Sequence, residues 1–224
     1  MLGRSGTGLL AVALLASGCA DFRAVNTTRE ESRDFPFHNT KLVIENEQSD
    51  LRLVPGAAGT VQVRRSLRGK ATLEGNASWT LVDGRLRLGA TCSGFVPDCG
   101  SLNVVAVPPE TAVEVTSDGG PVRSAGFAGD LTADVTRGWL RVEDPVGTLR
   151  LRCSTANLTV TGARSTDVTA VADHGDAHVA LIVAPSRVEV HAGGLAELTL
   201  PPSADPARAV VTSDRGEVTV RRGA

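Results

Sequence analysis

The segment "VEVTSDGGPVRSAGFAGDLTADV", residues 113–135, spans one period of the repeat that decides the fold of this chain. Alternating stretches, "VEVTS" and "LTADV", stand at its two ends, and a glycine-rich turn and a second short strand lie between them. Side chains of a β-strand point alternately to its two faces, so every second residue is predicted to face inward. The same pattern returns at residues 149–153, 168–172, 188–192 and 209–213.

The inward positions of these strands align in columns whose successive members lie 18, 18, 19, 20 and 21 residues apart. A second alternating strand follows each turn and adds two more columns. The first strands give Val113, Leu131, Leu149, Val168, Val188, Ala209; then Val115, Ala133, Leu151, Ala170, Val190, Val211; then Ser117, Val135, Cys153, Ala172, Ala192, Ser213. The second strands give Leu140, Leu158, Ala177, Ala196, Val218 and Val142, Val160, Val179, Leu198, Val220.

A period near 19 residues with two short strands is typical of one coil of a parallel β-solenoid. One coil buries about six apolar side chains, roughly 9–18 kcal/mol, and ordering its backbone costs a similar amount or more. Each coil therefore needs neighbours. We predict an all-β fold, a parallel, β-helix-like solenoid of about six coils of ~19 residues over residues 111–222. The alternative is an antiparallel β-sandwich, whose strands also alternate between frequent turns.

Residues 41–110 precede the repeat and are predicted to form an N-terminal β-strand region, a short β-meander with a disulfide hairpin. Its clearest signal is "WTLVDGRLRL", in which Asp83 and Gly84 lie between two alternating runs. This dipeptide between strands predicts a two-residue hairpin turn.

The first eighteen residues have the layout of a signal peptide, with Arg4 ahead of an apolar run that is too short to span a membrane. The following "ASGC" resembles the bacterial lipobox, which implies cleavage before Cys19 and a diacylglyceryl thioether, with acyl chains such as palmitate, on its sulfur. The alternative is an ordinary secretory peptide. Residues 19–40 are then a lipidated cysteine and a flexible tether, and the protein is exported and anchored to the outer face of the bacterial cell membrane.

Three cysteines remain after Cys19. Export permits disulfides, and "CSGFVPDC" holds glycine and proline between Cys92 and Cys99, so we predict a bridge between these two. Cys153 falls in an inward column and is predicted to be a buried, free thiol that packs as a small apolar residue.

These features together resemble the bacterial "putative adhesin" family of β-strand-repeat domains, a domain family of unknown function. The resemblance covers about residues 35–222 and includes the opening pair "LVIENEQSDLRL", the step "VVAVPPETAVEV" and the turns "TSDGGPV" and "TSDRGEV". It implies adhesion. The turns depart from the Ser-Gly-Asp pattern of that family, so the resemblance carries no binding residue over to this chain.

Signals for chemistry are sparse. The stretch "DHGDAH" brings together Asp173, His174, Asp176 and His178, with His191 placed to stack nearby, and these side chains are zinc-ligand types. Alternation puts them in different directions, so a solvated turn is the preferred interpretation and we assign no metal site. No GxSxG, HExxH, Walker or GxGxxG motif occurs, and no catalytic residue and no cofactor are predicted.

A net charge of −2 argues against a nucleic-acid partner. We therefore expect a non-enzymatic envelope lipoprotein that presents a β-solenoid surface to an envelope protein or a cell-wall glycan. One alternative is a polysaccharide-active enzyme on a β-helix, which predicts a groove lined by convergent carboxylates and arginines. The outward Arg123, Arg141, Arg150 and Arg152 are weighed for it, and a solvated face is the preferred interpretation for them. Another is a structural or sensory lipoprotein.

Overall fold

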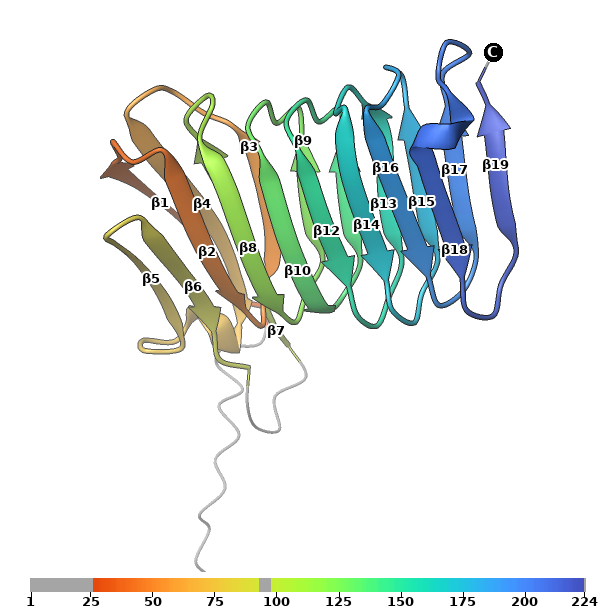
Figure 1. Ribbon diagram of the computed structural model, residues 1–224. Helices are drawn as coiled ribbons and strands as arrows, with labels where there is room; N and C mark the ends of the chain where they lie inside the picture. The colour runs from red at the N-terminus through yellow and green to blue at the C-terminus, as the bar shows by residue number, and fades with distance from the viewer. Residues whose placement is uncertain (1–25, 93–97, 224) are drawn as a thin grey trace, which may run out of the picture.

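A computed structural model describes residues 26–92 and 98–223, which form an all-β structure of two mixed, open sheets that face each other (Figure 1). The predictions for the signal peptide and for Cys19 lie outside the described residues. In spatial order, the ten-stranded sheet consists of β1 (Thr28–Pro36), β4 (Thr60–Gly69), β7 (Cys99–Val107), β3 (Asp50–Pro55), β9 (Val122–Ala125), β11 (Leu140–Glu143), β13 (Leu158–Ala163), β15 (Ala177–Leu181), β17 (Ala196–Leu200) and β19 (Val218–Arg222).

The nine-stranded sheet lies in front of the other in Figure 1, and the chain alternates between the two sheets from β8 onward. Two short 3-10 helices, η2 (Lys70–Thr72) and η3 (Pro206–Arg208), lie in connections between strands. In spatial order, this sheet consists of β18 (Ala209–Ser213), β16 (Arg187–Ala192), β14 (Asp167–Ala172), β12 (Leu149–Cys153), β10 (Leu131–Arg137), β8 (Ala112–Asp118), β2 (Lys41–Glu47), β6 (Arg85–Ala90) and β5 (Ala77–Val82).

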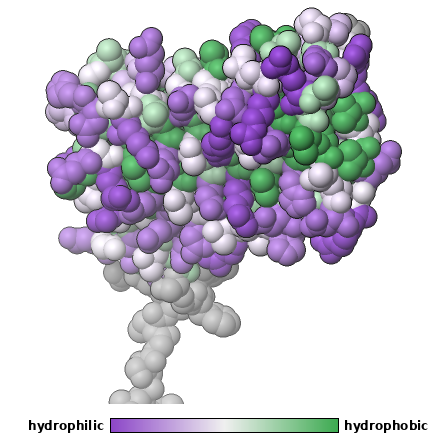
Figure 2. Space-filling view, in the orientation of Figure 1, coloured by the Kyte–Doolittle hydropathy of each residue, from purple (hydrophilic) through white to green (hydrophobic). Residues whose placement is uncertain are grey.

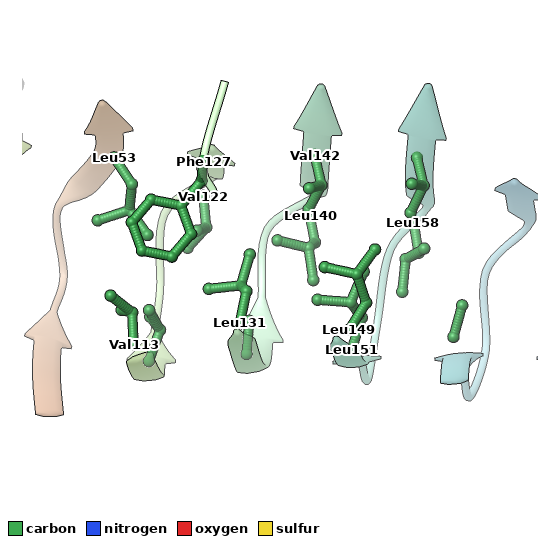
Figure 3. Packing of buried hydrophobic residues seen from close by; sticks show 14 of the residues in the cluster. Leu53, Val113, Val122, Phe127, Leu131, Leu140, Val142, Leu149, Leu151 and Leu158 are labelled. Carbon is green, nitrogen blue, oxygen red and sulfur yellow. The ribbon is translucent and has the colours of Figure 1, made fainter. Parts of the chain in front are cut away.

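Equivalent strands of successive repeats pair in parallel, and they do so in the register that the sequence columns predict. Leu140 pairs with Leu158, which pairs with Ala177, and the columns of the nine-stranded sheet are confirmed in the same way. We call one strand of the nine-stranded sheet and the next strand of the ten-stranded sheet a rung. Leucine and valine side chains from neighbouring rungs fill the space between the sheets (Figure 3).

The turns of the rungs form two edges. At the lower edge of Figure 1, each strand of the nine-stranded sheet turns into the following strand of the ten-stranded sheet, and at the upper edge the chain returns. The rungs approach very closely there. A Cβ added to Gly147 would lie 2.3 Å from the carbonyl oxygen of Gly129 in the rung before it, so the upper edge needs glycine at this position.

The N-terminal region is not the separate meander that the sequence predicts. β2 pairs in parallel with β8, with Leu42 beside Val113, and β3 pairs in parallel with β9, with Leu51 beside Val122. β2 and β3 are therefore one more rung, on which the predicted repeat stacks directly. The chain leaves this rung after β3 and returns to it at β8, and the intervening β4–β7 extend both sheets.

The predicted tether is also shorter than expected. Thr28–Pro36 form β1, which pairs antiparallel with β4 along its whole length. Most of its side chains are charged and exposed, and Phe35 is buried. Charged residues suit an edge strand because they discourage further pairing, and this explains why β1 carries no apolar alternation.

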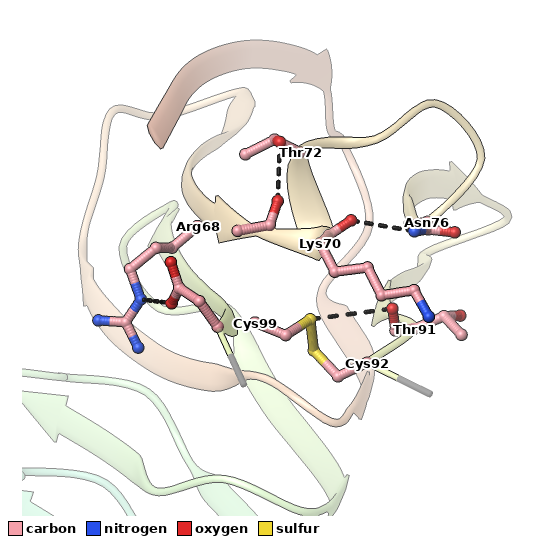
Figure 4. Close-up of a disulfide and its surroundings, with 9 residues drawn as sticks. Arg68, Lys70, Thr72, Asn76, Thr91, Cys92 and Cys99 are labelled. Carbon is pink, nitrogen blue, oxygen red and sulfur yellow. Dashed lines mark hydrogen bonds and ion pairs between the residues drawn. A yellow bond between two sulfur atoms is a disulfide. The ribbon is translucent and has the colours of Figure 1, made fainter. Parts of the chain in front are cut away.

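Two predicted local features are present. β5 and β6 form the hairpin, with Asp83 and Gly84 at φ of 50° and 75°, as a type I′ turn requires. Cys92 and Cys99 form the disulfide, which closes a loop beside η2 at the lower edge (Figure 4). Cys153 is buried and free, as expected, and burial raises the pKa of its thiol.

Candidate functional site

The histidines and aspartates of "DHGDAH" do not converge. His178 lies on β15 in the ten-stranded sheet, where its Nδ1 is 3.1 Å from Oε2 of Glu197. His191 lies on β16 in the other sheet, and its Nδ1 is 3.0 Å from the hydroxyl of Thr212. Within residues 26–92 and 98–223 there is no group of three or more His, Cys, Asp or Glu side chains arranged to hold a metal ion.

The remaining residues of this stretch stabilise the lower edge. Asp173 accepts a hydrogen bond from Nε of Arg152 at 3.0 Å, and Asp176 accepts one from the backbone N–H of Leu195 at 2.8 Å. The Nδ1 of His174 lies 2.9 Å from the carbonyl oxygen of Ser154. Each contact reaches a neighbouring rung, so these polar residues join successive turns.

The outward arginines that were weighed as groove residues contact neighbouring carboxylates or an aromatic ring. Arg123 and Arg141 lie side by side on the outward face, as predicted. Arg123 binds the Glu143 carboxylate at 2.6 Å, and Arg141 lies 5.9 Å from the ring centre of Trp139. Arg150 binds Asp167 with two hydrogen bonds. Paired carboxylates thus neutralise Arg123 and Arg150, whereas Arg141 lies near an aromatic ring.

Ion pairs cover most of the outward face of the nine-stranded sheet. Arg85 and Arg87 both bind Glu45 and hold the pKa of its carboxyl below the ordinary value, and Arg150 does the same to Asp167. The pairs on this face, from the N-terminal side, are Arg85–Glu45, Arg87–Glu45, Lys41–Glu114, Arg137–Asp118, Arg150–Asp167, Arg152–Asp173 and, on β16, Arg187–Glu189.

The pattern changes at β14, β16 and β18. Here a shallow hollow of about 230 Å³ lies on the outward face, and Figure 2 shows apolar side chains gathered over this C-terminal part of the molecule. Val210 is 55% exposed beside the hollow. We call this region the C-terminal face; its outward side chains are Thr169, Val171, Glu189, His191, Val210 and Thr212.

Two ionisable side chains, Glu189 and His191, lie on the C-terminal face, and each contacts a charged neighbour. Glu189 binds Arg187 at 2.7 Å, and this contact raises the pKa of the Arg187 guanidinium. The Nε2 of His191 lies 3.6 Å from the Asp214 carboxylate. A hollow with an exposed valine and a few oriented polar groups is compatible with a binding surface.

The last rung, β18 and β19, adjoins the C-terminal face and is less covered than the rungs before it. Val218 and Val220 occupy inward columns, yet they are 44% and 47% exposed, whereas Ala196 and Leu198 in the preceding rung are buried. We call this pair of strands the C-terminal rung.

The sequence analysis missed the C-terminal face. The outward residues of the repeat also form columns, and one of them runs Arg152, Val171, His191, Thr212. Reading the outward columns with the same register would have shown that the columns of Arg152 and Arg150 go on to include Val171 and Val210.

No protein-family model and no curated protein sequence matches the chain. Solved structures do resemble it. A "putative cell adhesion protein" from Clostridium sporogenes is 10% identical and has a TM-score of 0.50, with 88% of this chain and 100% of that one covered. A "putative adhesin" from Bacteroides fragilis is 11% identical with a TM-score of 0.47, covering 87% and 97%. At this identity, the first of these likenesses shows a shared fold and nothing further.

Proposed function

We propose that the protein is a non-enzymatic cell-envelope lipoprotein, built as a parallel β-solenoid, that binds a protein partner through its C-terminal face. The observation that carries this proposal is the contrast along the nine-stranded sheet. Ion pairs cover its outward face as far as Arg150–Asp167, and beyond them a single arginine–glutamate pair on β16 adjoins a hollow with an exposed valine. Exposed apolar patches on folded domains mark interaction sites.

The parallel stacking supports the solenoid description. Neighbouring rungs repeat the same register, and each contributes inward side chains to one continuous core. A rigid stack of this kind presents a long surface, which suits display and binding.

Export agrees with the Cys92–Cys99 disulfide, because such bonds persist in oxidising compartments outside the cytoplasm. Within the part of the chain that the structure describes, no helix has the length and hydropathy needed to cross a bilayer. The attachment to the membrane that we propose is the thioether at Cys19.

The chain geometry suggests how such an anchor holds the body. The backbone N–H of Asn26 donates to the carboxylate of Asp98 at 3.1 Å, and Asp98 directly precedes Cys99 of the disulfide. Six residues lie between Cys19 and Asn26, and a fully extended chain of that length spans at most about 25 Å. The lower edge then faces the membrane, and the C-terminal face points sideways to a partner in the same envelope.

The test is crosslinking in cells with a photoreactive amino acid at one position. A residue placed at Val210 should give one discrete protein adduct, and the exposed Thr132 on β10 serves as the matched control on the same sheet face. Val171→Lys should remove the adduct. Equal adducts at both positions, or none at Val210, contradict the proposal. For the anchor, Cys19→Ser should abolish labelling by a palmitate analogue.

A further inference from the structure

One edge of β19 has main-chain groups that are directed away from the sheet. Glu217 accepts a bond from Ala196 at 3.0 Å, and Gly223 donates to Leu200 at 2.8 Å, so the main-chain groups of alternate residues point toward β17. Strand geometry directs those of the intervening residues, Val218, Val220 and Arg222, to the opposite edge. Among residues 26–92 and 98–223, no strand pairs with that edge.

The same residues carry the exposed inward side chains. Val218 and Val220 are roughly half exposed because no further rung within residues 26–92 and 98–223 covers them, although Ala196 and Leu198 in the same columns of the preceding rung are buried. The edge thus offers hydrogen-bonding groups together with two apolar side chains on one face. These are the two features by which an added strand is recognised, with main-chain bonds for affinity and side-chain contacts for specificity.

Charge indicates what kind of strand fits. Arg221 is 66% exposed, and its ion-pair partner, Glu197, also contacts His178. Arg222 has no ion-pair partner among the described residues. Glu217 lies before the first residue of β19, so the C-terminal half of β19 contains two arginines and no acidic residue. On β18, by contrast, Ala209 and Val211 are already half-buried.

We propose that β19 accepts an extended segment of the partner protein as an added strand, with apolar side chains over Val218 and Val220 and acidic side chains on the opposite face beside Arg221. This inference rests on the proposed function, because it specifies how the partner is held. A second copy of the chain is the competing occupant, and the experiment below distinguishes it.

The probes are two labelled, end-capped peptides, SVEVEVS and SVKVKVS, titrated against the full chain in detergent at low salt and followed by fluorescence anisotropy. We expect the acidic peptide to bind at least tenfold more tightly than the basic one. Arg221→Glu with Arg222→Glu should reverse this order. The control, Arg52→Glu with Arg164→Glu, changes the net charge equally at exposed positions away from β19 and should leave the order unchanged.

Val220→Pro tests the main-chain bonds, because proline lacks the N–H that points to the free edge while the bonds to β17 stay in place. It should weaken the acidic peptide at least tenfold, with the melting temperature recorded to verify folding. Equal binding of both peptides, the same reversal in the control, or full binding by Val220→Pro would each overturn the proposal.

Two further outcomes separate the hypotheses. If sedimentation shows a dimer and Val220→Pro dissociates it, the free edge of β19 binds a second copy of the chain. That result would overturn the proposal that it binds an acidic segment of a partner protein. If the Val210 adduct persists in cells while neither peptide binds, the proposed function stands and strand addition fails. If the peptide binds and the adduct is absent, the peptide result supports the edge and the proposed function fails at the C-terminal face.

Discussion

The two ends of the stack differ in how they terminate the core. At the N-terminal end, Phe35 and Phe37 are 7% and 5% exposed and cover the inner space. Arg65 lies 4.0 Å above the ring of Trp79 and binds Glu31 at 2.5 Å. At the C-terminal end, inward valines of the last rung are roughly half exposed.

This difference shows that the repeat alone cannot cover the inward side chains of its terminal rungs. Every rung buries its inward residues on its neighbours, so each terminal rung needs other residues to cover it. Aromatic rings and a paired arginine do this at the N-terminal end. The C-terminal rung has no such residues in residues 98–223, and it is where we place partner binding. The predictions below test this contrast, from the largest effect to the smallest.

Phe35→Ala should destabilise the protein most, by about 3–5 kcal/mol, because it removes a buried ring and leaves a cavity at the covered end. Urea unfolding followed by circular dichroism measures the change. The matched control is Val82→Ala, since Val82 is 64% exposed at the same end. A loss below about 1 kcal/mol for Phe35→Ala would show that this end is no better covered than the other.

Gly147→Ala should cost about 1–3 kcal/mol, because the new Cβ meets backbone atoms of the preceding rung that cannot move aside. Gly223→Ala, next to the C-terminal rung, meets its nearest atoms at 3.8 Å, an ordinary contact, and should change stability little. Unfolding of the two variants in the same denaturant compares the middle of the stack with its open end. Equal effects would contradict the close stacking.

Val160→Ala and Val220→Ala make the same change in one inward column. Val160 is 1% exposed and should lose about 2 kcal/mol, from two lost methyl groups and a small cavity. Val220 is 47% exposed and should lose less than about 1 kcal/mol. If the two losses are equal in unfolding experiments, another part of the chain covers the C-terminal rung.

Sequence reasoning was most successful in the middle of the stack. There each inward column is apolar and each period is nearly constant, so alternation and spacing were enough to place Leu140 beside Leu158. The first rung was missed because 71 positions separate Leu42 from its partner Val113, and this interval breaks the period. β1 was missed because an edge strand with charged side chains has the composition of a tether.

The ends of the stack cannot be predicted from the columns alone. Val218 and Val220 continue their columns with the same residue types as the buried members, and alternation carries no information about whether another rung follows. The covering role of Phe35 and Arg65 depends on contacts between distant segments. The C-terminal face was a different case, because its outward column was available in the sequence and was not read.

The smallest effect concerns the last tight ion pair before the C-terminal face. Arg150 lowers the pKa of Asp167 in the folded state, so the pair stabilises the fold at pH values above the unfolded pKa of about 3.9. That stabilisation disappears as the pH falls through the lower, folded pKa. Both side chains are about one-third exposed or more, and solvent therefore limits the contribution to less than about 1 kcal/mol.

Asp167→Asn should thus reduce the free energy of unfolding slightly at pH 7 and not at pH 2, measured against Arg150→Met and the double variant. A coupling energy between Arg150 and Asp167 above about 2 kcal/mol, or one that persists at pH 2, would contradict this expectation. If the charges on this face contribute so little to stability, their main effect is to keep the face up to β12 hydrated, which leaves the C-terminal face, where charges are fewer, for the partner that we propose.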